Sequence, residues 1–541
     1  MRFSSRGCGA ARTAAAVFSM LVSSGPALAE AQLAAFSQTS VYAQALATSA
    51  ATDDALSDFY RARNYQPLWT GPQDAARREL LLNALDTAAL HGLPTVRYDS
   101  AALRDGFRAA LTEGDRGRLE LAMSQAYLAF AHDLSSGVLV PSTIDPTILR
   151  DTTPPSPALL LARASGAGFA RYLRDLPPAS PQYARMIKEK LLLEAQIAAG
   201  GFGPPVPAEA LQPGDTGTAV VALRDRLMAL GYLGRSATRT YDRAVQSAVQ
   251  RFQMDNGLTP DGSAGPGTIT AVNSEPQDRL ESVIVAMERL RWIGDIDLGA
   301  RHIWVNQPDF TAQIVDNGLV TFQTRAVIGR EELDRRTPEF SDVMEFMVIN
   351  PSWSVPRSIT TKEYLPMLRA NPNAVSHLQV IDSAGRIVPR GAVNFAAYSD
   401  GNFPFALRQP PSDGNALGIV KFMFPNANNI YLHDTPSKSL FDEEVRAFSH
   451  GCIRLADPRD FAYALLARQT DDPKAVFQDL LETGRESRLD LVTPVPVHLV
   501  YFTAWPNAKG QMTYRRDIYG RDAEIYQALE NAGMVLAQVQ G

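Results

Sequence analysis

At 541 residues the chain exceeds what one hydrophobic core usually supports, and a prior of roughly 150 residues per domain predicts about three domains. The formal net charge is −6 and no long Lys/Arg run occurs, so we expect no nucleic-acid partner. No uncharged apolar run reaches the roughly 20 residues that a membrane-spanning helix needs, so we also expect no membrane span.

Residues 1–29 have the composition of a secretory signal peptide. Three arginines precede an apolar run, and Ala27-Leu28-Ala29 offers a small-residue cleavage site. We therefore expect export from the cytoplasm and loss of Cys8 with the signal. Residues 30–52 are rich in Ala, Ser, Thr and Gln, which predicts a flexible leader, with order beginning near Asp53.

Residues 53–205 show helical periodicity interrupted by prolines, which predicts a helical scaffold domain without chemistry of its own. A Gly/Pro-rich linker then ends this domain. Residues 206–275 contain two short amphipathic helical patterns, separated by a glycine turn, and a last helical turn. This segment includes the strings Leu211-Gln212-Pro213-Gly214-Asp215, Leu230-Gly231-Tyr232-Leu233, Val249-Gln250-Arg251-Phe252-Gln253, Gly257-Leu258 and Asp261-Gly262. In these strings the segment resembles the small three-helix peptidoglycan-binding domain.

The following segment, residues 276–297, has one apolar helical stripe and is predicted to pack back on the scaffold, which makes the binding domain an insertion. Strand-like segments dominate residues 298–500, and Asp316-Asn317-Gly318 is a hairpin signal. A partly helical section at about 356–415 interrupts these strands and is expected to be a capping subdomain. A strand and a helix are expected in residues 501–541. The predicted fold class is multidomain α+β.

A single cysteine remains after the expected cleavage, in Ser449-His450-Gly451-Cys452-Ile453-Arg454. A lone exported thiol among imidazoles is better explained by nucleophilic catalysis than by a disulfide bridge. At a pKa of about 8.5 a cysteine is only a few per cent thiolate, so Cys452 needs a base or a cationic neighbour. We prefer His433, which ends an apolar run nineteen residues earlier, as this base. His450 is the alternative.

The residues around the thiol have further candidate roles. Gly451 lacks a Cβ, so the backbone amides of Gly451 and Cys452 are candidates for an oxyanion hole. Ser449 is expected either to bond an imidazole or to cap the turn. Arg454 would hold the thiolate or a substrate carboxylate, unless it forms a surface ion pair. Tyr431, just before His433, is grouped with the residues that bind or orient the substrate.

The pattern of a histidine followed by Ser-His-Gly-Cys, an apolar residue and Arg resembles the L,D-transpeptidases with a YkuD-type catalytic domain. Similarity to the large periplasmic members extends to Met287-Glu288-Arg289-Leu290-Arg291-Trp292, Arg336-Thr337-Pro338, Asn350-Pro351 with Trp353, Val355-Pro356-Arg357-Ser358-Ile359 and His433-Asp434-Thr435-Pro436. Smaller members usually have Gly where this chain has Asp434.

The resemblance implies a periplasmic enzyme that acts on the tetrapeptide stems of peptidoglycan. Cys452 would attack the bond between the L-centre of meso-diaminopimelate and D-Ala, release D-Ala and form a thioester, which a second diaminopimelate amine converts into a 3-3 cross-link. It also implies acylation by carbapenems, wall-synthesis enzymes as partners, and no metal or other cofactor. Glycan strands are the expected partner of the peptidoglycan-binding domain, unless this domain acts only as a spacer. Three other interpretations are an L,D-carboxypeptidase or amidase-type hydrolase, a non-catalytic wall-binding protein, and a zinc site made of His433, His450 and Cys452.

Overall fold

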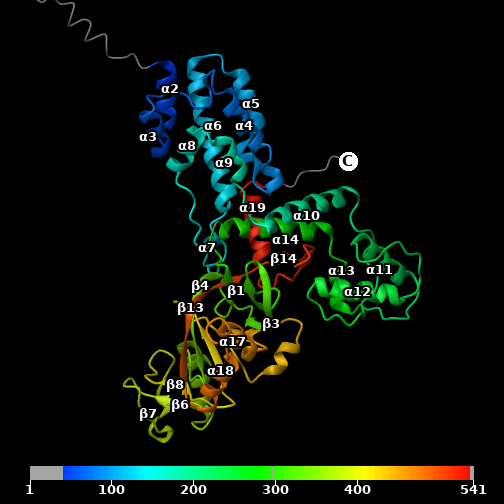
Figure 1. Cartoon of the computed structure of the whole chain (residues 1–541), viewed down its shortest axis with the longest axis vertical. Coiled ribbons are helices and arrows are strands. Elements are labelled where there is room, and N and C mark those ends of the chain that lie inside the picture. The colour runs from blue at the N-terminus through cyan, green and yellow to red at the C-terminus, as the bar shows by residue number, and fades with distance from the viewer. Residues whose placement is uncertain (1–39, 295, 536–541) are drawn as a thin grey trace, which may run out of the picture.

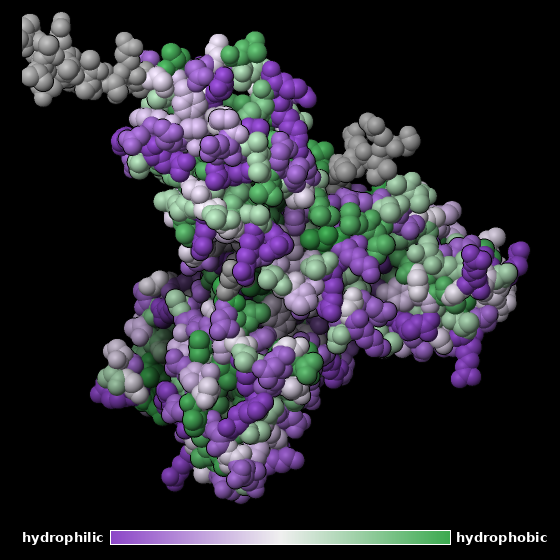
Figure 2. Space-filling model, turned by 45° about the horizontal axis from the view of Figure 1, so that its top comes forward, coloured by the Kyte–Doolittle hydropathy of each residue, from purple (hydrophilic) through white to green (hydrophobic). Residues whose placement is uncertain are grey.

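The computed structural model describes residues 40–294 and 296–535, so the expected signal peptide lies outside the described residues. These residues form a helical lobe, a small helical domain to one side of it, and a mainly β lobe with an appended cap (Figure 1). Hydrophilic side chains cover much of the visible surface, with smaller apolar areas between them (Figure 2). Within the described ranges, no helix combines the length and the apolar character needed to cross a membrane.

Helices whose starts carry side-chain caps build the N-terminal lobe. Thr112 and Asp115 form a reciprocal capping box, while Ser156 and Ser180 each cap a helix that has proline at its first position. The lobe buries Trp69, Tyr127 and Phe130 in its core. Its helices are α2 (Val41–Ala50), α3 (Asp54–Ala62), α4 (Ala75–Leu85), α5 (Ser100–Ala109), α6 (Glu113–Ser136), α7 (Pro141–Ile144), α8 (Pro157–Ser165), α9 (Phe169–Asp175) and α10 (Pro181–Ala198), with the 3-10 turns η1 (Ala88–His91) and η2 (Thr95–Tyr98).

Helix α2 corrects the prediction of a flexible leader that reaches residue 52. Ser40 caps this helix by accepting the Ala43 amide at 3.1 Å, and Leu46 is fully buried. The helix can approach α6 closely because Gly117 has no side chain: a Cβ there would lie 2.6 Å from the carbonyl oxygen of Tyr42. The Ala-rich composition therefore conceals one buried face, and order in the described chain begins before Asp53.

The predicted three-helix domain consists of α11 (Thr218–Ala229), α12 (Arg243–Asp255) and α13 (Pro266–Val272). Leu223, Leu227, Val249 and Phe252 form part of its separate core. The fully buried Arg226 fixes its ends, because the guanidinium donates to the carbonyl oxygens of Val272, Ser274 and Gly203.

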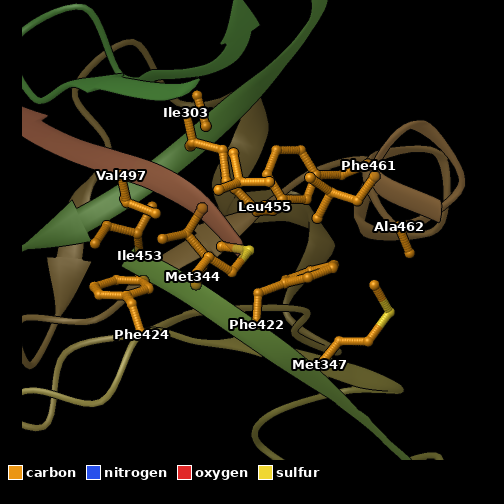
Figure 3. Packing of buried hydrophobic residues seen from close by; sticks show 14 of the residues in the cluster. Ile303, Met344, Met347, Phe422, Phe424, Ile453, Leu455, Phe461, Ala462 and Val497 are labelled. Carbon is orange, nitrogen blue, oxygen red and sulfur yellow. The ribbon is translucent and has the colours of Figure 1, made fainter. Parts of the chain in front are cut away.

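The sheet of the mainly β lobe has nine strands in the order β11-β3-β12-β10-β9-β4-β13-β1-β2, and an additional β3–β2 pairing closes it on itself. Ile303, Met344, Phe422, Ile453 and Val497, each from a different strand, point toward one another in its interior (Figure 3). Helices α17 (Pro458–Leu466) and α18 (Pro473–Glu482) contribute Phe461 and Phe477 to the same core. The strands are β1 (Arg301–Asn306), β2 (Thr311–Asp316), β3 (Leu319–Gly329), β4 (Phe340–Ile349), β9 (Val420–Met423), β10 (Leu432–His433), β11 (Ala447–Ser449), β12 (Ile453–Leu455) and β13 (Ser487–Val500).

The expected cap is a small unit with its own sheet, β5-β8-β6-β7, inserted between β4 and β9. Leu365, Leu368, Phe395 and Leu407 belong to its separate core. Its elements are β5 (Trp353–Ser354), α15 (Arg357–Ile359), the π-helical turn η3 (Thr360–Tyr364), α16 (Leu365–Ala370), β6 (Gln379–Ile381), β7 (Ile387–Val388), the 3-10 turns η4 (Arg390–Ala392) and η5 (Phe395–Ala397), and β8 (Ala406–Gln409).

Helix α14 (Pro276–Ile293) joins the lobes, together with the C-terminal hairpin β14 (Ala504–Pro506) and β15 (Met512–Tyr514) and the helix α19 (Arg521–Asn531). The C-terminal segment thus has two short strands where the sequence predicted one. A buried ionic network crosses the junction: Arg289 bonds Glu339 at 2.6 Å, and Arg521 bonds Glu339 at 3.1 Å and Asp145 at 2.9 Å.

We expect Arg521→Met to destabilise the protein by about 3–5 kcal/mol, because it leaves two buried carboxylates short of a partner. Arg521 is fully buried and also donates to the carbonyl oxygen of Thr337. Chemical denaturation measures the change. In the control, Arg61→Met breaks an exposed pair with Asp58 and should cost less than about 1 kcal/mol. Equal losses in the two variants would contradict a stabilising role for the network.

Candidate active site

Strand register brings the predicted site residues together. β10 and β12 run parallel, with Leu432 opposite Ile453 and His433 opposite Arg454. Leu432 and Ile453 are fully buried in the sheet interior. Because side chains alternate along a strand, Tyr431, His433, Cys452 and Arg454 lie on the opposite face of these two strands. The sheet thus places an imidazole, a thiol, a phenol and a guanidinium side by side.

His433 is held as a neutral imidazole. Its Nδ1 lies 2.5 Å from the carbonyl oxygen of Asp434, a contact that requires the hydrogen on Nδ1 and leaves Nε2 free to accept a proton. Burial, followed by the cationic side chains of Arg454 and Lys421, lowers the His433 pKa to about 3 against the opposing effect of the bond to Asp434. At neutral pH this ring is therefore a base without a charge.

Asp434, the departure from the usual glycine, makes the backbone after His433 rigid. Its buried carboxylate accepts the Ile419 amide at 2.9 Å and the Lys438 ammonium at 2.5 Å. Glycine at position 418 leaves room for this carboxylate, since a Cβ there would collide with it. The side chain is thus part of the frame that holds the His433 ring, rather than a solvated loop residue.

Cys452 is a protonated thiol in this arrangement. Burial raises its pKa to about 11, while hydrogen bonds from Tyr431 and the charge of Arg454 act in the opposite direction. The Sγ atom lies 3.5 Å from the carbonyl oxygen of Asn429. Since the thiol does not ionise alone near pH 7, attack on a carbonyl requires transfer of its proton to a base.

The turn before the thiol is stabilised from inside the protein. Gly451 has φ = +111°, a conformation that favours glycine. Ser449 Oγ accepts the Gly451 amide at 3.1 Å and donates to the carbonyl oxygen of Cys452 at 2.5 Å. Ser449 therefore caps the turn and does not bond an imidazole. The Gly451 amide is already used, which corrects its expected place in an oxyanion hole and leaves the Cys452 amide as the candidate.

His450 points to the cap instead of the base position. Its Nε2 lies 2.8 Å from Glu363 of η3, and the same carboxylate oxygen accepts Arg335 at 2.9 Å. Lys362, next to Glu363, pairs with Asp334 at 3.2 Å. The two ends of this contact come from the turn before Cys452 and from the inserted subdomain, so the cap is tied directly to that turn.

Sequence reasoning missed two residues of this site. Thr337 is fully buried and donates from Oγ1 to the carbonyl oxygen of Gly451 at 2.8 Å. Lys421, opposite His433 on β9, is a second cation beside the imidazole, and burial lowers its pKa. The signal for Lys421 was its place in the alternating segment Val420–Met423, where it interrupts buried apolar residues. In the described part of the chain, no group of three or more His, Cys, Asp or Glu side chains could hold a metal ion.

We expect alkylation of Cys452 by iodoacetamide to accelerate about tenfold per pH unit between pH 7 and 10, because this reagent reacts with the thiolate and the thiol pKa is about 11. Arg454→Met should slow alkylation at each pH by removing a charge that favours the thiolate. Mass spectrometry measures the rate. A plateau already reached by pH 8 would contradict a raised pKa.

Three segments match known domain families. Residues 300–497 match the family described as the L,D-transpeptidase catalytic domain (YkuD), residues 216–272 a putative peptidoglycan binding domain, and residues 54–189 a scaffold domain. A curated protein of Haemophilus influenzae named "Putative L,D-transpeptidase" is 30% identical over 269 residues, which are 49% of this chain and 53% of that protein. The alignment thus spans about half the length of the curated relative.

Solved structures also show similarity. The L,D-transpeptidase of Xylanimonas cellulosilytica (residues 123–326) has 19% identity and a TM-score of 0.17, covering 55% of this chain and 100% of that one. The L,D-transpeptidase of Stackebrandtia nassauensis has 15% identity and a TM-score of 0.21, with coverage of 55% and 97%. The family matches, rather than these superpositions, identify the domains.

Proposed function

We propose that this chain, which contains a YkuD L,D-transpeptidase catalytic domain and a peptidoglycan-binding domain, forms 3-3 cross-links in peptidoglycan. The observation that carries the proposal is that Cys452 directly precedes β12, that His433 lies on the parallel neighbour β10, and that alternation puts both side chains on the same face. The substrate would be a tetrapeptide stem that ends in meso-diaminopimelate and D-Ala. This substrate places the protein in the periplasm, where such stems are found.

The proposed reaction has two steps. In the first, Cys452 Sγ bonds to the carbonyl carbon of the L-centre of diaminopimelate, its proton passes to His433 Nε2, and the proton then leaves on the amine of the departing D-Ala. In the second, the side-chain amine of another diaminopimelate attacks the thioester, His433 takes the amine proton, and Cys452 is released as a thiol. No redox partner is needed. A carbapenem would acylate the same thiol.

The charges around the thiol support a substrate with carboxylates. Lys421 and Arg454 flank His433 on the neighbouring strands, one on each side. Among the residues that the structure describes, the Arg454 guanidinium forms no ion pair, and its buried Nε has no hydrogen-bond partner. Both stem peptides and the D-Ala end carry carboxylates, and guanidinium–carboxylate pairing is strong and directional. Arg454 is therefore the proposed substrate carboxylate ligand.

Incubation of the purified protein with a defined disaccharide-tetrapeptide tests the function. Transfer predicts release of D-Ala together with a 3-3 linked dimer, identified by mass spectrometry. Release of D-Ala with a tripeptide product and no dimer would replace transfer by L,D-carboxypeptidase activity. No turnover and no carbapenem adduct would leave a non-catalytic wall-binding protein.

The helical domain is proposed to deliver the enzyme to the wall. We expect deletion of residues 207–275 to weaken binding to isolated sacculi at least severalfold while changing turnover of a soluble tetrapeptide less, because the domain has its own core and contains none of the site residues. Co-sedimentation measures sacculus binding. Equal co-sedimentation of the full and shortened chains would reduce this domain to a spacer.

A further inference from the structure

A cavity lies away from the thiol, where three parts of the chain meet. It has a volume of about 240 Å³ and is lined by α13 of the helical domain, by α14, and by the residues that end the C-terminal hairpin. Thr270, Arg279, Ser282, Tyr514 and Arg516 belong to its wall. Figure 1 shows the domain of α11–α13 beside α14, where this junction forms.

Arg279 is the unusual member of the wall. Its side chain is only 8% exposed, yet its Nε has no hydrogen-bond partner among the residues that the structure describes. The guanidinium lies over the rings of Tyr514 at 4.7 Å and Phe202 at 5.5 Å. Ring contacts offset only part of the cost of burying a cation, and buried guanidinium groups normally bond an anion.

The neighbouring charges are already matched by other groups. Arg515 pairs with Asp309 at 2.5 Å, and Arg516 pairs with Glu444 at 3.0 Å. The acidic residue in the wall, Asp278, accepts the Glu275 amide at 2.9 Å as part of the cap of α14. Arg279 is thus the cation of the wall that forms no ion pair among the described residues; its Nε is shielded from solvent, so an incoming anion would bind the terminal nitrogens of the guanidinium.

We propose that this cavity binds a carboxylate of a peptidoglycan stem peptide, with Arg279 as the anion ligand and the hydroxyl of Thr270 as a further partner. The choice of ligand rests on the proposed function. The volume is below the 300–1,000 Å³ typical of sites that enclose a drug-sized molecule, so it fits the end of a peptide and leaves the glycan outside. Because helical domain, α14 and hairpin all contribute, an occupant would fasten the domain to the rest of the protein.

The test is calorimetric titration of the full chain carrying Cys452→Ala and Arg454→Met, which remove turnover and the proposed carboxylate ligand beside the thiol, with a disaccharide-tetrapeptide and with its fully amidated form. Arg279→Gln should weaken binding of the acidic form about tenfold, the size of one charged hydrogen bond. Amidated ligand should bind weakly to both proteins. Arg243→Gln, the same change at an exposed position outside the cavity wall, is the matched control and should have no effect.

A second variant keeps all charges. Ala271→Leu narrows the cavity from the side of α13 and should also weaken binding of the acidic ligand. This variant tests the site if the Arg279→Gln protein does not fold. Undiminished binding by a folded Arg279→Gln or Ala271→Leu protein, or equal affinity for acidic and amidated ligand, would overturn the site. Product analysis with the wild-type enzyme is a separate readout, so loss of cross-linking activity and loss of this site are distinguishable.

Discussion

Cys452→Ala is expected to abolish both D-Ala release and cross-linking, and to prevent formation of a covalent carbapenem adduct. No other sulfur nucleophile is found among the residues that the structure describes. The small loss of volume at a half-buried position should leave the fold intact. Intact-protein mass spectrometry after exposure to meropenem, and product analysis with tetrapeptide, measure the two effects.

The control for this variant is thermal unfolding together with sacculus binding, both of which should match the unaltered protein. Cys452→Ser adds a stricter comparison, because a hydroxyl in the same place is a much poorer nucleophile and should also be inactive. If the alanine variant still forms the carbapenem adduct, or still cross-links, the nucleophile is another residue.

His433→Ala should lower the rate of Cys452 acylation by about 10²–10⁴-fold, the usual contribution of a positioned general base. The neutral ring with a free Nε2 supports this role, and the raised thiol pKa makes the base necessary. His450→Ala should cost much less, since its ring bonds Glu363 of the cap. Single-turnover acylation, followed by mass spectrometry, gives the rates.

The dependence of the acylation rate on pH follows from the pKa shifts of His433 and Cys452. His433 is neutral above a pKa of about 3, and Cys452 is protonated below about 11, so the reactive neutral pair predominates between these values. We expect acylation to stay flat from pH 5 to 9, without the acidic decline that an ordinary imidazole would cause near 6.5. His377→Ala, an exposed cap histidine, is the matched control. A larger loss in His450→Ala than in His433→Ala would exchange the two roles.

The predictions that succeeded depended on patterns within short stretches of the chain. Helical stripes, the strand-rich C-terminal half and the inserted cap follow from local periodicity, and the family motifs identify the domains that the comparisons match. The predictions that were wrong depend on contacts between segments far apart in the sequence. Helix α2 is fixed by a buried face against Gly117 of α6, a contact that composition does not reveal.

The site shows the same division. Alternation along two strands is enough to group His433 with Tyr431, and Cys452 with Arg454, but which strands are neighbours depends on the whole sheet. Lys421 and Thr337 join the site through long-range pairing, which spacing alone does not encode. The sequence predicts an oxyanion-hole role for the Gly451 amide because the bond of this amide to Ser449 forms only in the folded turn.

The bond from Thr337 to Gly451 affects how short an active fragment of the chain can be. Thr337 is held in turn by Tyr519, whose hydroxyl accepts the Thr337 amide at 3.3 Å and donates to Gly329 at 2.6 Å. Tyr519 lies beyond residue 497, where the match to the catalytic family ends. An excised fragment ending there would keep the thiol and the imidazole yet lose the Tyr519 contacts that hold Thr337 beside the turn before Cys452. We therefore expect the smallest active fragment to extend through the C-terminal helix.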